Sequence, residues 1–182
     1  MTSRWIAAGA AACAVALLAV PLMLRGAGAR EKEPAAPSSA TAGTTKGEPA
    51  NLDLTVKDMN GASVRLADYK GQVIVLNFWA TWCGPCQMEI PELVQTYAEY
   101  KDKGVVVLGM SIDDTPETLR DYAPQKKMTY PILLMQDDVE QAYGPIIGVP
   151  ITFFIGRDGT IGQKHFGPVT KAQAEQEIKA LL

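Results

Sequence analysis

The sequence predicts an α/β domain in which a mixed central sheet is flanked by helices. Apolar, strand-like runs at residues 73–79, 104–112 and 151–155 are separated by segments whose apolar residues recur at helical spacing. The last run is followed by a hairpin turn at residues 157–160 and a further strand. Strands that alternate with helices and then close on a hairpin imply parallel and antiparallel pairs in one sheet.

The segment before this alternation predicts an N-terminal β-hairpin. Apolar and polar residues alternate at residues 52–56 and again at 64–66, on either side of a turn signal at residues 59–61. The run at residues 73–79 is almost continuously apolar, which is typical of a central strand covered on both faces.

Helices are predicted between the strands and at the end of the chain. After Cys86 the apolar residues repeat at helical spacing, and we expect Pro91 to kink this helix. A start signal at residues 113–117 predicts a second helix that ends near Lys126. The remaining predicted elements are a strand at 132–135, a helical segment at 139–143, a strand ending at Phe166, and a last helix that begins at a Thr170/Gln173 capping box and ends at Leu182.

The first 48 residues are predicted to lie outside this domain. Residues 1–25 contain an uncharged apolar run long enough to cross a bilayer, so they form either a membrane anchor or a signal that is cleaved near residues 27–29. Residues 26–48 are rich in Ala, Pro, Ser, Thr and Gly and are predicted to be a disordered linker. The domain itself spans residues 49–182.

The composition limits the function classes. The chain has 182 residues, of which 47% are hydrophobic, and this suits one packed domain with appendages. Its net charge of −3 gives no sign of a nucleic-acid-binding surface. We therefore expect no nucleic-acid partner. We also expect a monomer.

Two cysteines carry the chemical prediction. Cys83 and Cys86 are separated by Gly84 and Pro85, and they follow the predicted strand directly. At the first turn of a helix, free backbone N–H groups and the positive end of the helix dipole favour a thiolate. We therefore expect Cys83 to be an exposed nucleophile. At i+3 spacing, Cys86 lies one turn deeper on the same side and is the resolving thiol.

Other uses of such a pair are less well supported. Structural zinc requires about four nitrogen or sulfur ligands, and the only other candidates in the chain are Cys13 and His165. Covalent haem attachment requires a histidine after the second cysteine, where this chain has Gln87. An inert disulfide closing so short a loop adds little stability in the chain-entropy model. We expect no metal and no organic cofactor.

Two segments together resemble a known family. Residues 77–86, Asn-Phe-Trp-Ala-Thr-Trp-Cys-Gly-Pro-Cys, and residues 148–155, Gly-Val-Pro-Ile-Thr-Phe-Phe-Ile, are similar to the two active-site segments of the thioredoxin superfamily. The N-terminal hairpin and an additional helix and strand at about residues 114–138 resemble the branch of TlpA/ResA-like membrane-anchored thioredoxins. This resemblance implies a thioredoxin-like fold with a helix-strand insert.

The resemblance also implies roles for individual residues. Pro150 matches the cis-proline that faces the dithiol and presents the backbone of Val149 to a substrate chain. Trp82 is expected to flank the nucleophile, and Pro85 to stiffen the first helical turn.

Acidic groups near the dithiol are a second point of comparison. Asn77 stands where plain thioredoxins have a buried acid on the central strand. Glu89 matches the family's acidic residue three positions after the second cysteine, where it either influences Cys86 deprotonation or is simply a solvated helix residue. His165 matches no motif of the family.

The function implied by these matches is a thiol:disulfide oxidoreductase that reduces protein disulfides, with apocytochromes c among the substrate classes of the family. A membrane thiol donor is expected to re-reduce the pair. The excess of basic residues after the apolar run opposes export. The expectation of an extracytoplasmic, periplasmic domain therefore depends on the signal-like N-terminus and on the resemblance.

Two alternatives remain open. A peroxiredoxin-type thiol peroxidase places its threonine further before the cysteine than Thr81 lies before Cys83. A copper-binding chaperone of similar fold has three residues between its cysteines, whereas this chain has two. Soft thiolates nevertheless suit Cu(I), with His165 as the candidate distal ligand.

Overall fold

A computed structural model describes residues 46–182. The predicted anchor or signal at residues 1–25 and all but the last residues of the linker at 26–48 lie outside this part of the chain. Within residues 46–182, no helix combines the length and the apolar character that crossing a bilayer requires.

The described residues contain a mixed five-stranded sheet with the order β5-β4-β3-β6-β7. The central strand β3 (Val73–Trp79) pairs in parallel with β4 (Val105–Ser111), which pairs in parallel with β5 (Ile132–Leu134). On its other side, β3 pairs antiparallel with β6 (Ile151–Ile155), and β6 pairs antiparallel with β7 (Ile161–Phe166). The predicted mixed sheet is confirmed, and β3 and β6 have the predicted bounds.

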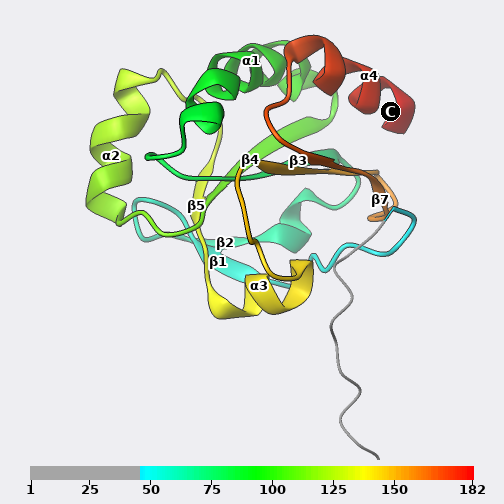
Figure 1. Cartoon of the computed structure of the whole chain (residues 1–182). Coiled ribbons are helices and arrows are strands. Elements are labelled where there is room, and N and C mark those ends of the chain that lie inside the picture. The colour runs from blue at the N-terminus through cyan, green and yellow to red at the C-terminus, as the bar shows by residue number, and fades with distance from the viewer. Residues whose placement is uncertain (1–45) are drawn as a thin grey trace, which may run out of the picture. The chain divides into compact units, whose positions relative to one another are not determined.

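Helices cover both faces of this sheet (Figure 1). Helices α1 (Gly84–Tyr100) and α4 (Lys171–Leu181) pack together above one face, where α2 (Pro116–Gln125) also lies. Helix α3 (Asp137–Tyr143) and the hairpin lie on the opposite face. The short 3-10 helices η1 (Leu66–Tyr69) and η2 (Lys101–Lys103) complete the fold.

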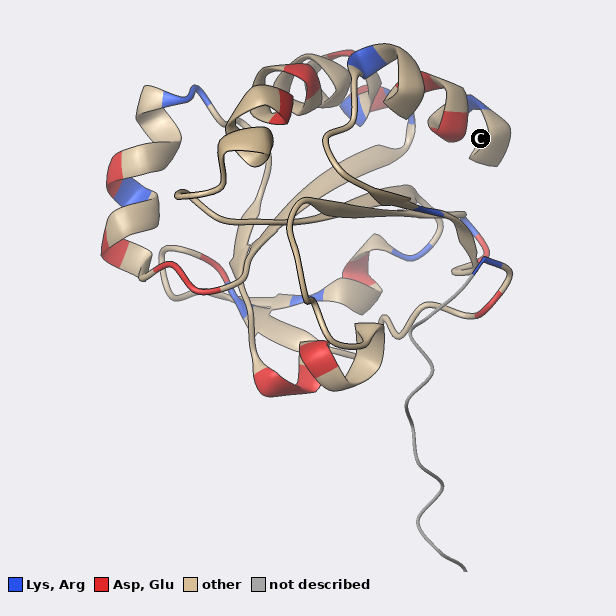
Figure 2. Ribbon diagram, viewed as in Figure 1, with Lys and Arg blue, Asp and Glu red and all other residues tan. Residues whose placement is uncertain are grey.

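The two-sided cover explains the apolar sequence of β3. Ile74, Leu76 and Phe78 pack into the core on the α3 side, whereas Val73 and Val75 pack on the α1 side. All five side chains are buried on folding, so neither face of β3 tolerates a polar residue without a hydrogen-bond partner. Charged residues of both signs are spread over the helices, the loops, the hairpin and β7, whereas β3, β4, β5 and β6 contain none (Figure 2).

The N-terminal hairpin is shorter than the sequence pattern predicts. Strands β1 (Thr55–Lys57) and β2 (Ser63–Arg65) pair antiparallel as a separate sheet, and Val56 lies opposite Val64. Leu52 and Leu54 alternate as expected, but they precede β1 and bury their side chains in the main core. The Leu54 carbonyl accepts the Leu66 amide at 3.0 Å, so the alternation reflects burial of one side of the chain together with this single hydrogen bond beyond the two strands.

The beginning of the described chain is attached to the β6–β7 turn. The amide of Gly47 donates to the carbonyl of Ile161 at 2.7 Å, and the amide of Ala50 donates to the carbonyl of Gly159 at 2.9 Å. This segment therefore extends the hydrogen bonding of the sheet beyond β7.

A close approach above Gly109 provides a test of the packing on the α1 side. A Cβ atom at Gly109 would lie 2.9 Å from Tyr130 Cε2 and 3.0 Å from Trp79 Nε1. Because both rings are buried, we expect Gly109→Ala to lower the free energy of unfolding by about 1–3 kcal/mol in urea denaturation. The control is Gly84→Ala, where a Cβ meets nothing within 4 Å. Equal effects of the two substitutions would contradict this account of the packing.

Candidate active site

The dithiol lies at the junction between β3 and α1. A short loop follows Trp79, and Cys83 is the N-cap of α1, with Pro85 in the first turn. The backbone N–H of Cys86 donates to Cys83 Sγ at 3.1 Å, and the two sulfur atoms form a disulfide. The predicted pair is therefore brought together, with the Cys83 sulfur at the positive end of the helix.

The exposure of Cys83 differs from the prediction. We expected an exposed nucleophile, but the Cys83 side chain is only 4% exposed, and Cys86 is fully buried. In the disulfide, Cys83 turns toward its partner and packs in the cluster that includes Trp79 and Ile90. Of the two sulfur-bearing residues, Cys83 is still the one that reaches the surface.

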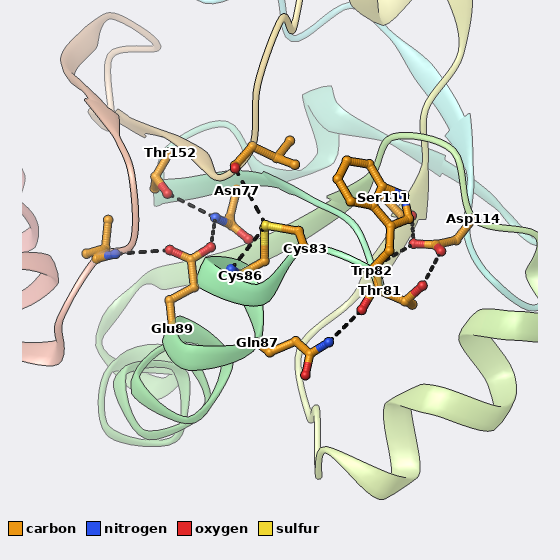
Figure 3. The surroundings of a disulfide bond; sticks show 12 residues. Asn77, Thr81, Trp82, Cys83, Cys86, Gln87, Glu89, Ser111, Asp114 and Thr152 are labelled. Carbon is orange, nitrogen blue, oxygen red and sulfur yellow. Dashed lines mark hydrogen bonds between the residues drawn. A yellow bond between two sulfur atoms is a disulfide. The ribbon is translucent and has the colours of Figure 1, made fainter.

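The proline loop faces the disulfide, as the resemblance implied. The Val149–Pro150 peptide bond is cis, and the carbonyl oxygen of Val149 lies 3.5 Å from Cys83 Sγ (Figure 3). Among the backbone hydrogen bonds of the described residues, none uses the amide or carbonyl of Val149. The main chain at this position is therefore open to a partner beside the disulfide.

Glu89 is buried beside the dithiol. Its side chain is 1% exposed, which rules out the solvated alternative. One carboxylate oxygen accepts a hydrogen bond from Asn77 Nδ2 at 2.8 Å, and the other accepts one from the Val169 amide at 3.0 Å. Asn77 also donates to Thr152 Oγ1 at 3.0 Å (Figure 3). The amide on β3 thus orients a carboxyl group that comes from α1.

Burial changes the acidity of this carboxyl group. Loss of hydration raises the pKa of Glu89 to about 7, although the hydrogen bonds from Val169 and Asn77 oppose the change. Glu89 follows Cys86 by one turn on the same side of α1. A group that exchanges a proton near neutral pH is therefore held close to the buried cysteine.

A loop after β4 holds the segment that precedes Cys83. Asp114 accepts hydrogen bonds from the backbone and side chain of Thr81 and from Ser111 Oγ. Asp113 accepts the indole N–H of Trp82 at 2.9 Å. Trp82 is 63% exposed and flanks the disulfide, as expected.

Sequence reasoning did not identify several of these site residues. It assigned Asp113 and Asp114 only to a helix start, and it gave no role to Thr152. Thr152 was detectable as a polar residue inside an apolar strand that follows the proline, since such a residue needs a buried partner. The contacts of Asp114 depend on the parallel pairing of β3 and β4, which places the loops after both strands side by side.

Together, the helix N-terminus, the disulfide and the buried acid define a class of protein. A cysteine pair that opens and closes beside an accessible backbone segment exchanges electrons with other disulfides. The fold and the site are those of a thioredoxin-like thiol:disulfide oxidoreductase. Among the described residues, no cluster of three potential metal ligands is present.

Comparisons with known proteins establish the family. The model of the AhpC/TSA family matches residues 47–164. The thiol-disulfide oxidoreductase ResA of Geobacillus kaustophilus (strain HTA426) is 35% identical over 132 residues, which cover 71% of this chain and 74% of the relative. The thioredoxin-like protein YneN of Bacillus subtilis (strain 168) is 34% identical over 128 residues, 69% of this chain and 75% of the relative.

Solved structures of similar fold support the same family assignment. A thiol:disulfide interchange protein of the thioredoxin family from Chlorobium tepidum TLS superposes with a TM-score of 0.68 at 25% identity, covering 75% of this chain and 96% of that one. StoA from Bacillus subtilis superposes with a TM-score of 0.59 at 26% identity, covering 68% and 94%. The chain belongs to the AhpC/TSA family and is a thiol:disulfide oxidoreductase with a thioredoxin-like fold.

The raised pKa of Glu89 predicts a pH-dependent stability. The folded state binds this proton more tightly than the unfolded chain, whose carboxyl has a pKa near 4.5. The stabilisation is therefore complete below about pH 4.5 and is lost as the pH rises to about 7. We expect the oxidised wild type to lose up to about 3 kcal/mol relative to Glu89→Gln across this interval.

Urea denaturation of both oxidised proteins from pH 4.5 to 8 measures this difference. Other titrating groups cancel because they are common to the two chains. A difference that does not change with pH would show that Glu89 titrates as an ordinary carboxyl group.

Proposed function

We propose that this enzyme reduces disulfides of exported proteins and that Cys83 is the attacking thiolate. The observation that carries the proposal is the position of the Cys83 sulfur, which caps α1 and accepts the Cys86 N–H at 3.1 Å. In the reduced enzyme, these helix N-terminal groups stabilise a negative charge on Cys83. Cys86 is fully buried and has no direct access to a protein substrate.

The reaction transfers two electrons to the substrate. The Cys83 thiolate attacks one sulfur of the substrate disulfide and forms a mixed disulfide, and the other substrate sulfur leaves as a thiolate. Cys86 then loses its proton and attacks the Cys83 sulfur, which releases the second substrate thiolate. The Cys83–Cys86 disulfide remains, in the arrangement that the structure contains.

Glu89 is the proposed acceptor for the Cys86 proton. Its carboxyl group has a pKa of about 7, because it is desolvated, so near neutral pH it is able to take up a proton and to return it. Asn77 and the Val169 amide fix its two oxygens. Plain thioredoxins are expected to carry a buried acid on the central strand, where this chain has Asn77. In this chain the buried acid is Glu89, on the neighbouring helix α1.

Substrate binding is assigned to the surface around Cys83. The amide and carbonyl of Val149, which make no hydrogen bond to another backbone group, are suited to pairing with an extended substrate chain, with Pro150 fixing the direction of this loop. Trp82 offers an exposed indole on the other flank, and Pro85 fixes the first turn of α1.

The same proposal includes the location of the enzyme and the source of its electrons. Residues 1–25 act as a membrane anchor or signal, residues 26–48 as a linker, and residues 49–182 as the catalytic domain on the extracytoplasmic, periplasmic side. A membrane thiol donor re-reduces the dithiol, and the enzyme works as a monomer. The apolar run at residues 5–24 and the similarity to ResA support this arrangement, and apocytochromes c are one candidate substrate class.

Trapping tests the order of attack. In Cys86→Ser the first step proceeds and the second is blocked, so mixed disulfides through Cys83 should accumulate on the full chain expressed with its N-terminal segment. Mass spectrometry of these adducts identifies the substrates. The matched control, Cys83→Ser, should trap none. Adducts that form equally on the control would assign the attack to Cys86 instead.

The proton-acceptor role of Glu89 predicts a specific kinetic defect. We expect Glu89→Gln to slow turnover of a protein disulfide about 100-fold near pH 7, because Cys86 loses its proton acceptor. The wild-type rate should rise through about pH 7, and the variant should lack this rise. Stopped-flow detection should show the mixed disulfide persisting in the variant.

Glu99→Gln is the matched control on the same helix, because Glu99 pairs with Lys103 and Lys171 at the surface. It should leave rate and pH profile unchanged. A slow first attack in Glu89→Gln, with no persistent intermediate, would contradict the assignment.

Peroxide consumption distinguishes the peroxidase alternative. The reduced full chain is mixed with hydrogen peroxide, and thiol oxidation is followed against a simple dithiol. Turnover far above that background would replace the proposal by a thiol peroxidase.

A further inference from the structure

An apolar bowl of about 550 Å³ lies against the cis-proline loop. It is formed where the chain leaves α3 and enters β6, together with the end of β7. Its lining residues are Tyr143, Gly144, Pro145, Ile147, Gly148, Val149, Pro150, Ile151, Lys164, Phe166 and Gly167. Two of its side chains are unusually exposed for apolar residues, Ile147 at 94% and Phe166 at 68%. Such exposed apolar groups around a concavity are typical of a binding surface.

The bowl is continuous with the site of disulfide exchange. Val149 and Pro150 belong to both, and the Val149 carbonyl oxygen lies 3.5 Å from Cys83 Sγ. An extended chain advances about 3.3 Å per residue. A client whose cysteine is bonded to Cys83 therefore places residues within about three positions of that cysteine over the bowl.

Lys164 gives the bowl its only charge, since it is the one charged residue in the lining. Its ammonium group lies 4.8 Å from the centre of the Phe153 ring and 5.2 Å from that of Phe166. Partial desolvation lowers the pKa of Lys164. In the part of the chain that the structure describes, no carboxylate forms an ion pair with it.

Two carboxylates, those of Asp113 and Asp114, lie on the other flank of the dithiol. Figure 3 places Asp114 and Thr152 on different sides of Cys83, and β7 lies beyond β6 on the side of Thr152. An acidic group of a client is therefore repelled by the loop of Asp113 and Asp114 and attracted toward Lys164.

We propose that this bowl is a specificity subsite for the client polypeptide: it binds an apolar side chain within about three residues of the reacting cysteine, next to a carboxylate that pairs with Lys164. The inference rests on the proposed disulfide reduction and names the sequence class of its preferred substrates. The apolar side chain contacts Ile147 and Phe166. The client's carboxylate forms an ion pair with the Lys164 ammonium group, which lies over the rings of Phe153 and Phe166.

Three oxidised peptides with one internal disulfide test the subsite. They differ only in the two residues beside the reacting cysteine: Leu-Glu, Leu-Lys and Ser-Glu. The reduced full chain in detergent reduces each of them, and kcat/KM is compared as ratios, so a loss of folded protein cancels. We expect Leu-Glu to exceed each of the other two by about 5-fold or more, equivalent to about 1 kcal/mol.

Charge reversal is the decisive comparison. Lys164→Glu should invert the preference between Leu-Glu and Leu-Lys, and Phe166→Ser should reduce the preference for Leu over Ser. Lys103→Glu is the matched control, because Lys103 also lies over a ring, that of Tyr100, at the far end of α1. It should leave both ratios unchanged.

Three results would overturn the inference. If all three peptides are reduced at the same rate, the bowl is not a specificity subsite, but the proposed function stands. If no peptide is reduced, both the subsite and the proposed function are contradicted. A concentration-dependent dimer in sedimentation that Phe166→Ser dissociates would assign the bowl to a second copy of the chain.

Discussion

The site depends on one contact, the backbone N–H of Cys86 with the sulfur of Cys83. This contact exists because α1 begins one short loop after the central strand, so the unpaired donors of the first helical turn meet the side chain of the N-cap residue. The most strongly buried strand of the sheet fixes the position of that turn. A reactive sulfur is thereby supported by the rigid centre of the fold rather than by a mobile loop.

The same arrangement explains why a carboxyl group is tolerated in the core. Glu89 loses its hydration, but Asn77 and the amide of Val169 replace part of what water supplied. The lost hydration that these two hydrogen bonds do not replace raises the pKa of Glu89 to about 7. A buried acid that is only partly compensated is an unfavourable element for stability, and it is suited to proton exchange with a cysteine one turn away.

Much of this fold was predictable because local and global signals agree. The bounds of β3 follow from an apolar run that is covered on both faces, and the last helix begins at its capping box. The hairpin strands were overestimated because the alternation of Leu52 and Leu54 reports mainly burial in the core, and only one hydrogen bond, from Leu66 to Leu54, extends the pairing there. The dithiol was predictable from spacing alone. The contacts of Asp114 and Thr152 were not, because they arise between segments brought together only by strand pairing.

The attachment of residues 47–50 to the β6–β7 turn has a consequence for orientation. Strand β6 runs antiparallel to β3, so this turn is at the pole of the sheet opposite to Cys83. With a seven-residue central strand, the two poles are about 20 Å apart. The amino-terminal side of the described chain is therefore joined to the sheet at the pole remote from Cys83, and its attachment leaves the surface around the disulfide unobstructed.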